Sequence, residues 1–270
     1  MNLKQIVALL DLDKIDQNEV KHAAGRRGFF KQAGDFSVKA ALATLPLAIT
    51  FIPKAVKAES KAVADVLNFA LTLEYLENEF YMKGLEASTL IPASDKAIFM
   101  QISKHEAAHV AFLKTALGNA AGSKPEFDFT AGGMFADAFS NYNTFLALAQ
   151  SFEDTGVRAY KGQAGNLIDD NDTLKVALQI HSVEARHASE VRRLRAKVSS
   201  MNIKGWVTGK ESNGAPQAIY DGEDNVTHGG ASLNSISSLA SVSANAKTEA
   251  FDEPLTKEAV LAIVTPFLKS

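Results

Sequence analysis

The chain has 270 residues, with 28 Lys and Arg against 31 Asp and Glu, a formal net charge of −3, 46% hydrophobic residues and no cysteine. This composition excludes collagen-like chains, disulfide-stabilised miniproteins and metal sites built on thiolates. The near-neutral charge gives no electrostatic signature of a nucleic-acid partner or of an anionic membrane surface. If the protein holds a cofactor, nitrogen and oxygen atoms must bind it.

The N-terminal segment 1–58 carries the features of an export signal. Residues 26–31 read Arg-Arg-Gly-Phe-Phe-Lys, and an apolar run follows at 40–52. This run is too short for a transmembrane span, because a membrane-crossing helix needs about 20 residues. Small residues at 56–58 then stand where a signal peptidase would cleave.

This leader resembles a twin-arginine signal, although Gly25 and Phe30 depart from its pattern and the stretch before the arginine pair is long. The resemblance implies the twin-arginine translocase as a partner, a mature chain that starts near Glu59, and a periplasmic or otherwise exported location. The alternative is a cytoplasmic protein whose N-terminal amphipathic helix contains an incidental arginine pair.

Four amphipathic helices are predicted after the leader. Apolar residues recur at steps of three and four along each segment, and no alternating strand pattern competes. Turn-forming residues separate the segments at 91–95, 118–132 and 169–172. The predicted fold is an all-α four-helix bundle at 61–200 with one long crossover, and its helices are expected at 61–87, 95–117, 134–163 and 173–200.

Each apolar stripe contains one glutamate where a hydrocarbon side chain is expected: Glu74, Glu106, Glu153 and Glu184. Burying an ionised carboxylate without a partner costs on the order of several kcal/mol. A single glutamate of this kind would ordinarily lie at the edge of its stripe and reach water. Four of them in one bundle instead require a common explanation.

Two of these glutamates begin a Glu-x-x-His motif, Glu106 with His109 and Glu184 with His187. Residues three apart lie on one helix face, with Cβ atoms about 5–6 Å apart. One carboxylate and one imidazole of each motif can therefore reach the same metal ion.

The other two glutamates show a second repeated pattern, since Glu74 and Glu153 each have a tyrosine two helical turns later, Tyr81 and Tyr160. These tyrosines either hydrogen-bond the ligands across the core or pack there. The separation between Glu74 and Glu153 along the chain differs by only one residue from the separation between the two Glu-x-x-His motifs. An internal repeat of helix hairpins explains both separations.

One glutamate from each of two helices, with Glu-x-x-His from each of the other two, resembles the ferritin-like superfamily of dinuclear carboxylate proteins. The resemblance covers residues 61–200. Segments at 67–77, 127–130 and 252–256 are similar to a bacterial ferritin-like domain group related to desiccation-associated proteins. The resemblance implies metal binding at Glu74, Glu106, His109, Glu153, Glu184 and His187.

The expected cofactors are two divalent transition-metal ions, iron or manganese. Two such ions balance the four carboxylate charges, and mixed oxygen and nitrogen ligands suit these redox metals. The predicted function is a dinuclear metal protein that reacts with oxygen or hydrogen peroxide, as an oxidase or a peroxide-removing enzyme. The alternatives are a non-catalytic, metal-sequestering or stress-protective envelope protein, and a structural bundle with an empty site.

Three further residues stand close to the predicted ligands. Glu77 follows Glu74 by one helical turn and is a candidate for an alternative ligand or for a contact to the ligands. His105 and His181 lie outside the motif positions. We expect both histidines at the surface or in contact with a ligand.

The pattern changes beyond the bundle. Residues 201–250 are rich in Gly and Ser and lack helical spacing, which predicts an irregular wrap over the bundle or a contact in a homo-oligomer. Helical spacing returns within 251–270 and predicts a short C-terminal helix. Because this extension would obstruct a compact ferritin-type cage, mineral storage is disfavoured.

Overall fold

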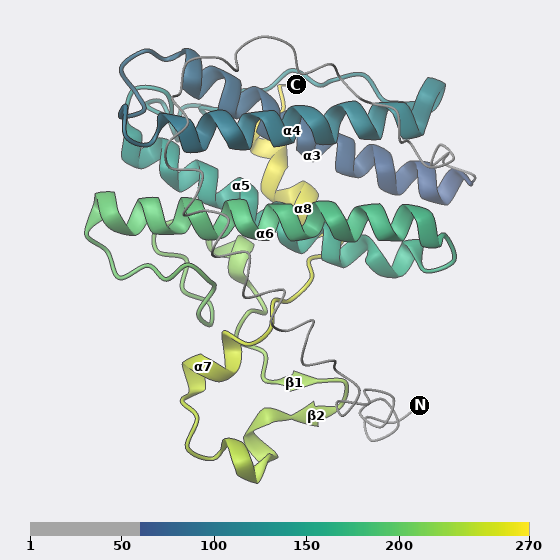
Figure 1. Cartoon of the computed structure of the whole chain (residues 1–270), viewed down its shortest axis with the longest axis vertical. Helices are drawn as coiled ribbons and strands as arrows, with labels where there is room; N and C mark the ends of the chain where they lie inside the picture. The colour runs from purple at the N-terminus through teal and green to yellow at the C-terminus, as the bar shows by residue number, and fades with distance from the viewer. Residues whose placement is uncertain (1–59, 270) are drawn as a thin grey trace, which may run out of the picture. The chain divides into compact units, whose positions relative to one another are not determined.

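The structure is a computed structural model that describes residues 60–269 (Figure 1). The predicted leader at 1–58, with its arginine pair, lies outside the described residues. Within the described part of the chain, no helix combines the length and the apolar character required to cross a bilayer.

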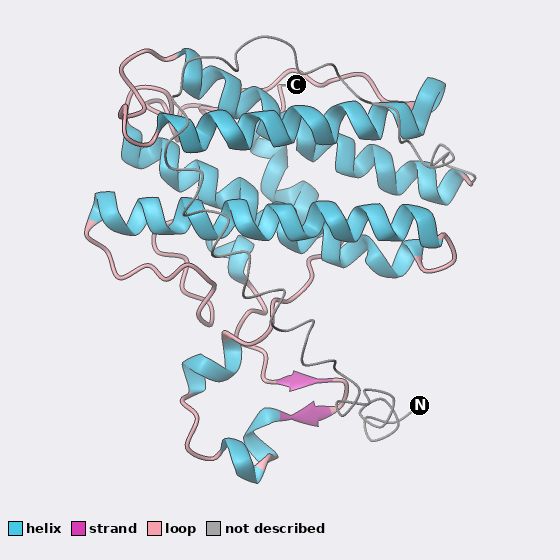
Figure 2. Ribbon diagram, in the orientation of Figure 1, coloured by secondary structure: helices cyan, strands magenta, loops and turns pink. Residues whose placement is uncertain are grey.

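The described residues form mostly α-helices, which confirms the predicted all-α bundle (Figure 2). Two helical hairpins, α3–α4 and α5–α6, pack against each other through α3 and α5. A long connection at 118–141 joins the hairpins. The four helices are α3 (Lys61–Glu86), α4 (Lys96–Leu117), α5 (Tyr142–Gln163) and α6 (Asn171–Ser199).

Side chains cap three of the four helix starts. Ser60, Asn141 and Asp170 each accept a hydrogen bond from a backbone N–H in the first turn of the helix that follows, at 3.2, 3.0 and 3.0 Å. Such caps satisfy backbone donors that have no partner within the helix and stabilise it by about 1 kcal/mol each. The caps therefore define where α3, α5 and α6 begin.

The third helix begins later than the sequence predicts, at Tyr142 and not at residue 134. Upstream of it, the Asp128 carboxylate accepts hydrogen bonds from backbone N–H groups, including that of Gly132, which has a φ of 68°. These local bonds favour turns over a helix. The apolar residues of this segment serve loop packing, since the Phe135 ring stacks on Phe267 at 6.0 Å.

An aromatic cluster fills the core between the two hairpins. The ring of Phe80 lies 4.7 Å from that of Phe145, 5.0 Å from that of Phe152 and 5.4 Å from that of Tyr81. Burying each phenylalanine contributes about 1.5–3 kcal/mol. The cluster packs around the Tyr81 ring and keeps water from that end of the bundle.

The chain ends in an extension with a short helix, as predicted, but the extension contains more regular structure than an irregular wrap. Its two strands pair antiparallel, and Gly229 and Gly230 form the turn with φ values of 57° and 82°. The strands are β1 (Thr227–His228) and β2 (Ala231–Ser232), and the helices are α7 (Ala244–Thr248) and α8 (Lys257–Val264). The 3₁₀ helices are η5 (Gln217–Tyr220), η6 (Leu233–Ser235), η7 (Ser237–Leu239) and η8 (Thr265–Phe267), besides η3 (Gly118–Ala120) and η4 (Ala164–Leu167) within the bundle.

The end of the extension is joined to the crossover between the hairpins. The backbone N–H of Asp128 donates to the Phe267 carbonyl at 2.8 Å, and that of Lys269 donates to the Glu126 carbonyl at 3.0 Å. The Phe267 ring also packs on Phe152 at 5.0 Å. The long connection therefore has a packing partner that lies far away in the sequence.

Buried arginines connect the extension to α5 and α6. The Asp154 carboxylate accepts hydrogen bonds from Arg192 Nε at 3.0 Å and from the Tyr220 hydroxyl at 2.6 Å. Gln150 donates to the same hydroxyl at 2.8 Å and accepts from Arg195 at 2.9 Å. This network satisfies polar groups that would otherwise be buried without partners.

Arg158 of α5 makes the second polar connection and is only 2% exposed. Its guanidinium donates to the carbonyls of Glu253 at 2.8 Å and Asp221 at 2.7 Å, and to that of Ile219. Its Nε also lies 2.9 Å from the Glu223 carboxylate. One side chain thus holds two separate segments of the extension against the bundle.

Replacing Arg158 by methionine is expected to lower the free energy of unfolding by about 3–5 kcal/mol, because it leaves a buried carboxylate and three carbonyls without their partner. Urea unfolding of the full chain measures the loss. Arg186→Met, which makes the same change at an exposed position of α6, is the control and should stay within about 0.5 kcal/mol of the wild type. Equal effects of the two changes would contradict the role of Arg158.

Candidate metal centre

The structure brings all six predicted ligands together in the middle of the bundle, from all four helices. The four carboxylates have no exposed surface, and the histidine side chains are 12% and 6% exposed. The residues are Glu74 on α3, Glu106 and His109 on α4, Glu153 on α5, and Glu184 and His187 on α6.

The ligand atoms form two overlapping groups. In the first, His109 Nδ1 lies 3.1 Å from Glu74, 3.2 Å from Glu106 and 3.2 Å from Glu184. In the second, Glu106 and Glu184 recur together with Glu153 and His187, and the ligand atoms of each group lie within 4.8 Å of one another. Glu106 and Glu184 are therefore shared, and each group has one further carboxylate and one imidazole.

Several of these atoms are buried without a hydrogen-bond partner among the described residues. They include one oxygen each of Glu106 and Glu153, both oxygens of Glu184 and Nδ1 of His187. His187 Nδ1 lies 2.9 Å from Glu106 and 3.3 Å from Glu153, yet neither contact has hydrogen-bond geometry. Unsatisfied buried polar atoms are rare in folded proteins. Their convergence, with only oxygen and nitrogen donors, fits transition-metal ions.

A family model described as a ferritin-like domain matches residues 62–197, about half of the chain. The chain belongs to the ferritin-like family. Among curated proteins, no relative matches the chain. The match includes all six predicted ligands, so the sequence repeat and the buried cluster belong to the ferritin-like domain itself.

The clustered charges of the ferritin-like domain shift the acidity of its ligands. The pKa of Glu74 is raised to about 7 and that of Glu184 to about 8, and burial is the main cause of both shifts. Burial alone would lower the pKa of His187, but attraction to the Glu153 and Glu106 carboxylates overcomes it and raises this pKa to about 11. Protons therefore neutralise part of the negative charge of the cluster in this structure.

Two tyrosines bind, crosswise between α3 and α5, the two carboxylates that each belong to only one ligand group; we call these the terminal carboxylates, Glu74 and Glu153. The Tyr81 hydroxyl of α3 donates to Glu153 of α5 at 2.5 Å, and the Tyr160 hydroxyl of α5 donates to Glu74 of α3 at 2.5 Å. The sequence left hydrogen bonding and packing open, and the structure shows the hydrogen bonds. Burial raises the pKa of both tyrosines well above the usual value, so both hydroxyls keep the proton that they donate.

His105 contacts a predicted ligand from outside the cluster. Its Nδ1 lies 2.8 Å from His187 Nε2, with the two rings stacked, and its Nε2 lies 2.7 Å from the Gln101 amide. Burial lowers the pKa of His105, which favours a neutral ring. This contact leaves His187 Nδ1 free to face the carboxylates. His181 instead binds the Val157 carbonyl at 3.0 Å and is not part of the cluster.

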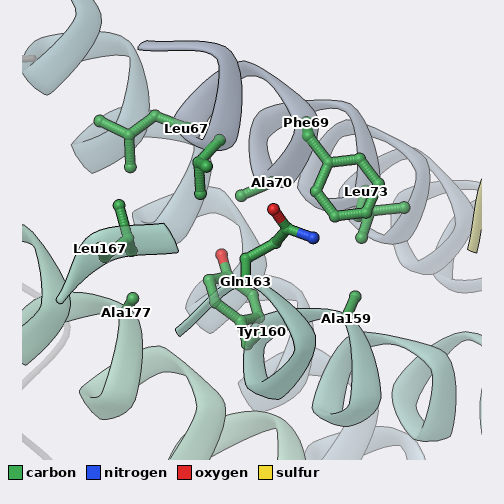
Figure 3. A pocket seen from close by; sticks show the side chains of 10 residues that line it. Leu67, Phe69, Ala70, Leu73, Ala159, Tyr160, Gln163, Leu167 and Ala177 are labelled. Atoms are coloured by element: carbon green, nitrogen blue, oxygen red, sulfur yellow. The ribbon is translucent and has the colours of Figure 1, made fainter. Parts of the chain in front are cut away.

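A small apolar cavity lies beside Tyr160, between α3, α5, η4 and α6 (Figure 3). Its volume of about 10 Å³ is roughly the space of one water-sized sphere. Leu67, Leu73 and Ala177 contribute to a lining that is apolar except near Gln163 and Tyr160. Such a cavity suits a small apolar molecule better than water.

Proposed function

We propose that the ferritin-like domain binds two divalent transition-metal ions, iron or manganese, and that the loaded protein reacts with oxygen or hydrogen peroxide. The observation that carries the proposal is the pair of overlapping ligand groups that share Glu106 and Glu184. Glu106 and Glu184 would therefore contribute to the binding of both ions. Each ion then keeps one carboxylate and one imidazole of its own.

The charges of the cluster support two ions. The carboxylates of Glu74, Glu106, Glu153 and Glu184 carry four negative charges when ionised, and all four side chains are fully buried. Two divalent cations cancel this charge, whereas one ion would leave two charges uncompensated in a region of low dielectric constant. Iron or manganese would supply the capacity to exchange electrons with oxygen or peroxide.

The remaining side chains of the domain prepare this site. Tyr81 and Tyr160 each hold one oxygen of a terminal carboxylate, which orients the other oxygen toward the cluster. The phenylalanines around Phe80 keep water away, and the apolar cavity at Tyr160 lies where a small substrate such as oxygen can approach.

A non-catalytic, metal-sequestering or stress-protective protein is the second candidate. The observation that favours it is the complete burial of all four carboxylates, together with the small size of the cavity beside Tyr160. Limited access is what a protein that only retains ions requires.

Substrate consumption distinguishes the two candidates. We expect the full chain loaded with Fe(II) or Mn(II) to consume oxygen or hydrogen peroxide faster than the same concentration of free ion. Glu106→Gln, which removes a shared ligand, should reduce the rate to that of the free ion. Glu190→Gln, an exposed glutamate on the same helix as Glu184, is the control and should match the wild type. Two bound ions with no consumption of either substrate would support sequestration.

We also propose that residues 1–58 direct export through the twin-arginine translocase to the periplasm. The support is the Arg-Arg-Gly-Phe-Phe-Lys segment at 26–31 with the apolar run after it. A route that carries folded proteins also suits a bundle that takes up its metal ions before transport.

Mass spectrometry of the native N-terminus tests the export proposal. We expect a mature chain that begins near Glu59 in the exported fraction. The double variant Arg26→Lys, Arg27→Lys should keep the leader and stay in the cytoplasm, because the charge is unchanged and only the guanidinium groups are lost. An unprocessed N-terminus and a cytoplasmic location in both proteins would refute export and leave the metal site unaffected.

A further inference from the structure

A polar pocket lies between α5, α6 and the extension, and none of the six candidate metal ligands lines it. Its volume of about 90 Å³ exceeds the roughly 10–15 Å³ that one water molecule requires. Residues of α5 and α6 line the pocket together with Trp206, Glu223 and Asp252 of the extension. The pocket can therefore hold a small molecule, and neither the bundle nor the extension forms it alone.

Glu223 presents to this pocket a buried carboxylate oxygen without a partner. The residue is only 2% exposed. Its Oε1 lies 2.9 Å from Arg158 Nε and accepts a hydrogen bond from the Glu253 backbone N–H at 3.1 Å. Its Oε2 is buried and has no hydrogen-bond partner among the described residues. Burial raises the pKa of Glu223 to about 7, although Arg158 lowers it. A donor at Oε2 would stabilise the ionised carboxylate.

The other buried charges of the pocket already have partners. Both oxygens of Asp154 accept hydrogen bonds from Arg192. The Arg158 guanidinium donates to three backbone carbonyls besides its ion pair with Glu223. Together with Asp252, which is exposed, the lining carries three carboxylates against two guanidinium groups. The pocket therefore offers one free acceptor and a surplus of negative charge.

These features select one class of ligand. An anion would face an unpartnered carboxylate oxygen and a surplus of like charge. A metal ion needs several ligand atoms close together, and Glu223 belongs to neither group of described residues that could hold one. An organic cation with N–H groups supplies both the missing donor and the balancing charge. Trp206 adds a third feature, because an indole face attracts organic cations.

We propose that the pocket lined by Glu223, Asp252 and Trp206 binds a small organic cation that carries N–H donors, such as an alkylguanidinium ion. One N–H group donates to Glu223 Oε2, the surplus negative charge of the lining balances the cation, and the Trp206 ring lies against it. The inference does not rest on the proposed metal binding, because the two sites share no residue. A bound cation would also bridge the bundle and the extension.

Fluorescence titration of the full chain with methylguanidinium chloride tests the inference, because Trp206 is the only tryptophan of the sequence. Sodium chloride keeps the ionic strength constant. We expect a saturable change in emission with a dissociation constant on the order of 1 mM, within the limit for a ligand of so few atoms. Tetramethylammonium chloride carries the charge without N–H donors and should bind at least about 10-fold more weakly. The absence of a saturable response to methylguanidinium, or equal binding of the two cations, would overturn the inference.

Glu223→Gln supplies the second measurement, since glutamine keeps an oxygen for Arg158 and places its own amide donor where the N–H of the ligand would lie. Its dissociation constant for methylguanidinium should rise at least about 10-fold. The matched control Glu211→Gln, exposed in the same extension, should bind as the wild type does. Asp252→Asn changes an exposed residue, so it should fold, and it should weaken binding by about 2–5-fold. Wild-type affinity in Asp252→Asn, or in a folded Glu223→Gln, would refute the proposed site.

Discussion

Replacing Glu106 and Glu184 together by glutamine is expected to abolish the binding of both metal ions, because each of the two ligand groups contains both residues. Elemental analysis of the purified protein should fall from two ions per chain to none. The protein should also lose its metal-dependent stabilisation, about 4 kcal/mol for each ion when the free metal concentration is roughly 1,000 times the dissociation constant. The metal-free variant should fold, since two buried charges are removed.

Variants of the terminal ligands provide the comparison. Glu74 and Glu153 each belong to one group only. The variants Glu74→Gln and Glu153→Gln should therefore each weaken the binding of one ion and leave the binding of the other unchanged. Glu190→Gln, exposed on α6, should keep two ions. If the double variant at the shared positions still held two ions, or if a terminal variant lost both, the assignment of shared and terminal ligands would be wrong.

Removing the metal is expected to destabilise the protein more at pH 8 than at pH 5. In the metal-free protein, burial raises the pKa of Glu74 from 4.5 to about 7 and that of Glu184 from 4.5 to about 8. A carboxyl group whose pKa is raised by folding favours the folded state while it is protonated, and this advantage is lost as the pH rises above 4.5 through the raised value.

The histidines make the stability of the metal-free protein fall with rising pH, as the carboxyl groups do. The neighbouring carboxylates overcome the effect of burial and raise the pKa of His187 from 6.5 to about 11, and they raise that of His109 further. A histidine with a raised pKa contributes stability that is complete below 6.5 and is lost as the pH rises. Metal binding strengthens with pH, because the ligands must lose their protons.

The melting temperature with and without a chelator, at pH 5 and at pH 8, tests this prediction. We expect the chelator to lower the melting temperature by several degrees at pH 8, on the order of 4 °C for each kcal/mol lost, and by much less at pH 5. Equal shifts at the two pH values would show that the ligand cluster does not exchange protons for metal ions.

The helical spacing predicted most of the fold, because apolar side chains at three- and four-residue steps can be buried together only on a helix. The spacing failed at 134–141, where Phe135 is apolar for packing against Phe267 and not for a helical stripe. Glycines and the hydrogen bonds of Asp128 hold the residues just before this segment in turns. A short apolar pattern does not by itself distinguish a helix from a loop that lies on the core.

The metal-site candidates were visible in the sequence because their chemistry is repeated. Glu106 and His109 share a helix face by their spacing alone, and the same motif recurs in the second hairpin as Glu184 and His187. The sequence left the role of the tyrosines open between hydrogen bonding and packing, because the hydrogen bond from Tyr81 to Glu153 joins two helices that are far apart in the sequence. A donor and an acceptor on different helices give no local pattern.

The sequence by itself determined the helical class, the two matched hairpins and the six candidate ligands, because helical period, turn residues and ligand spacing are local properties of the chain. Only the tertiary structure decided which atoms meet. It showed the crosswise tyrosines, the contact of His105 with His187, the connection of the extension through Arg158, and the position of Glu77 opposite Gly156. Each of these depends on the packing of segments distant in the sequence, which sets distances that spacing along one helix cannot give.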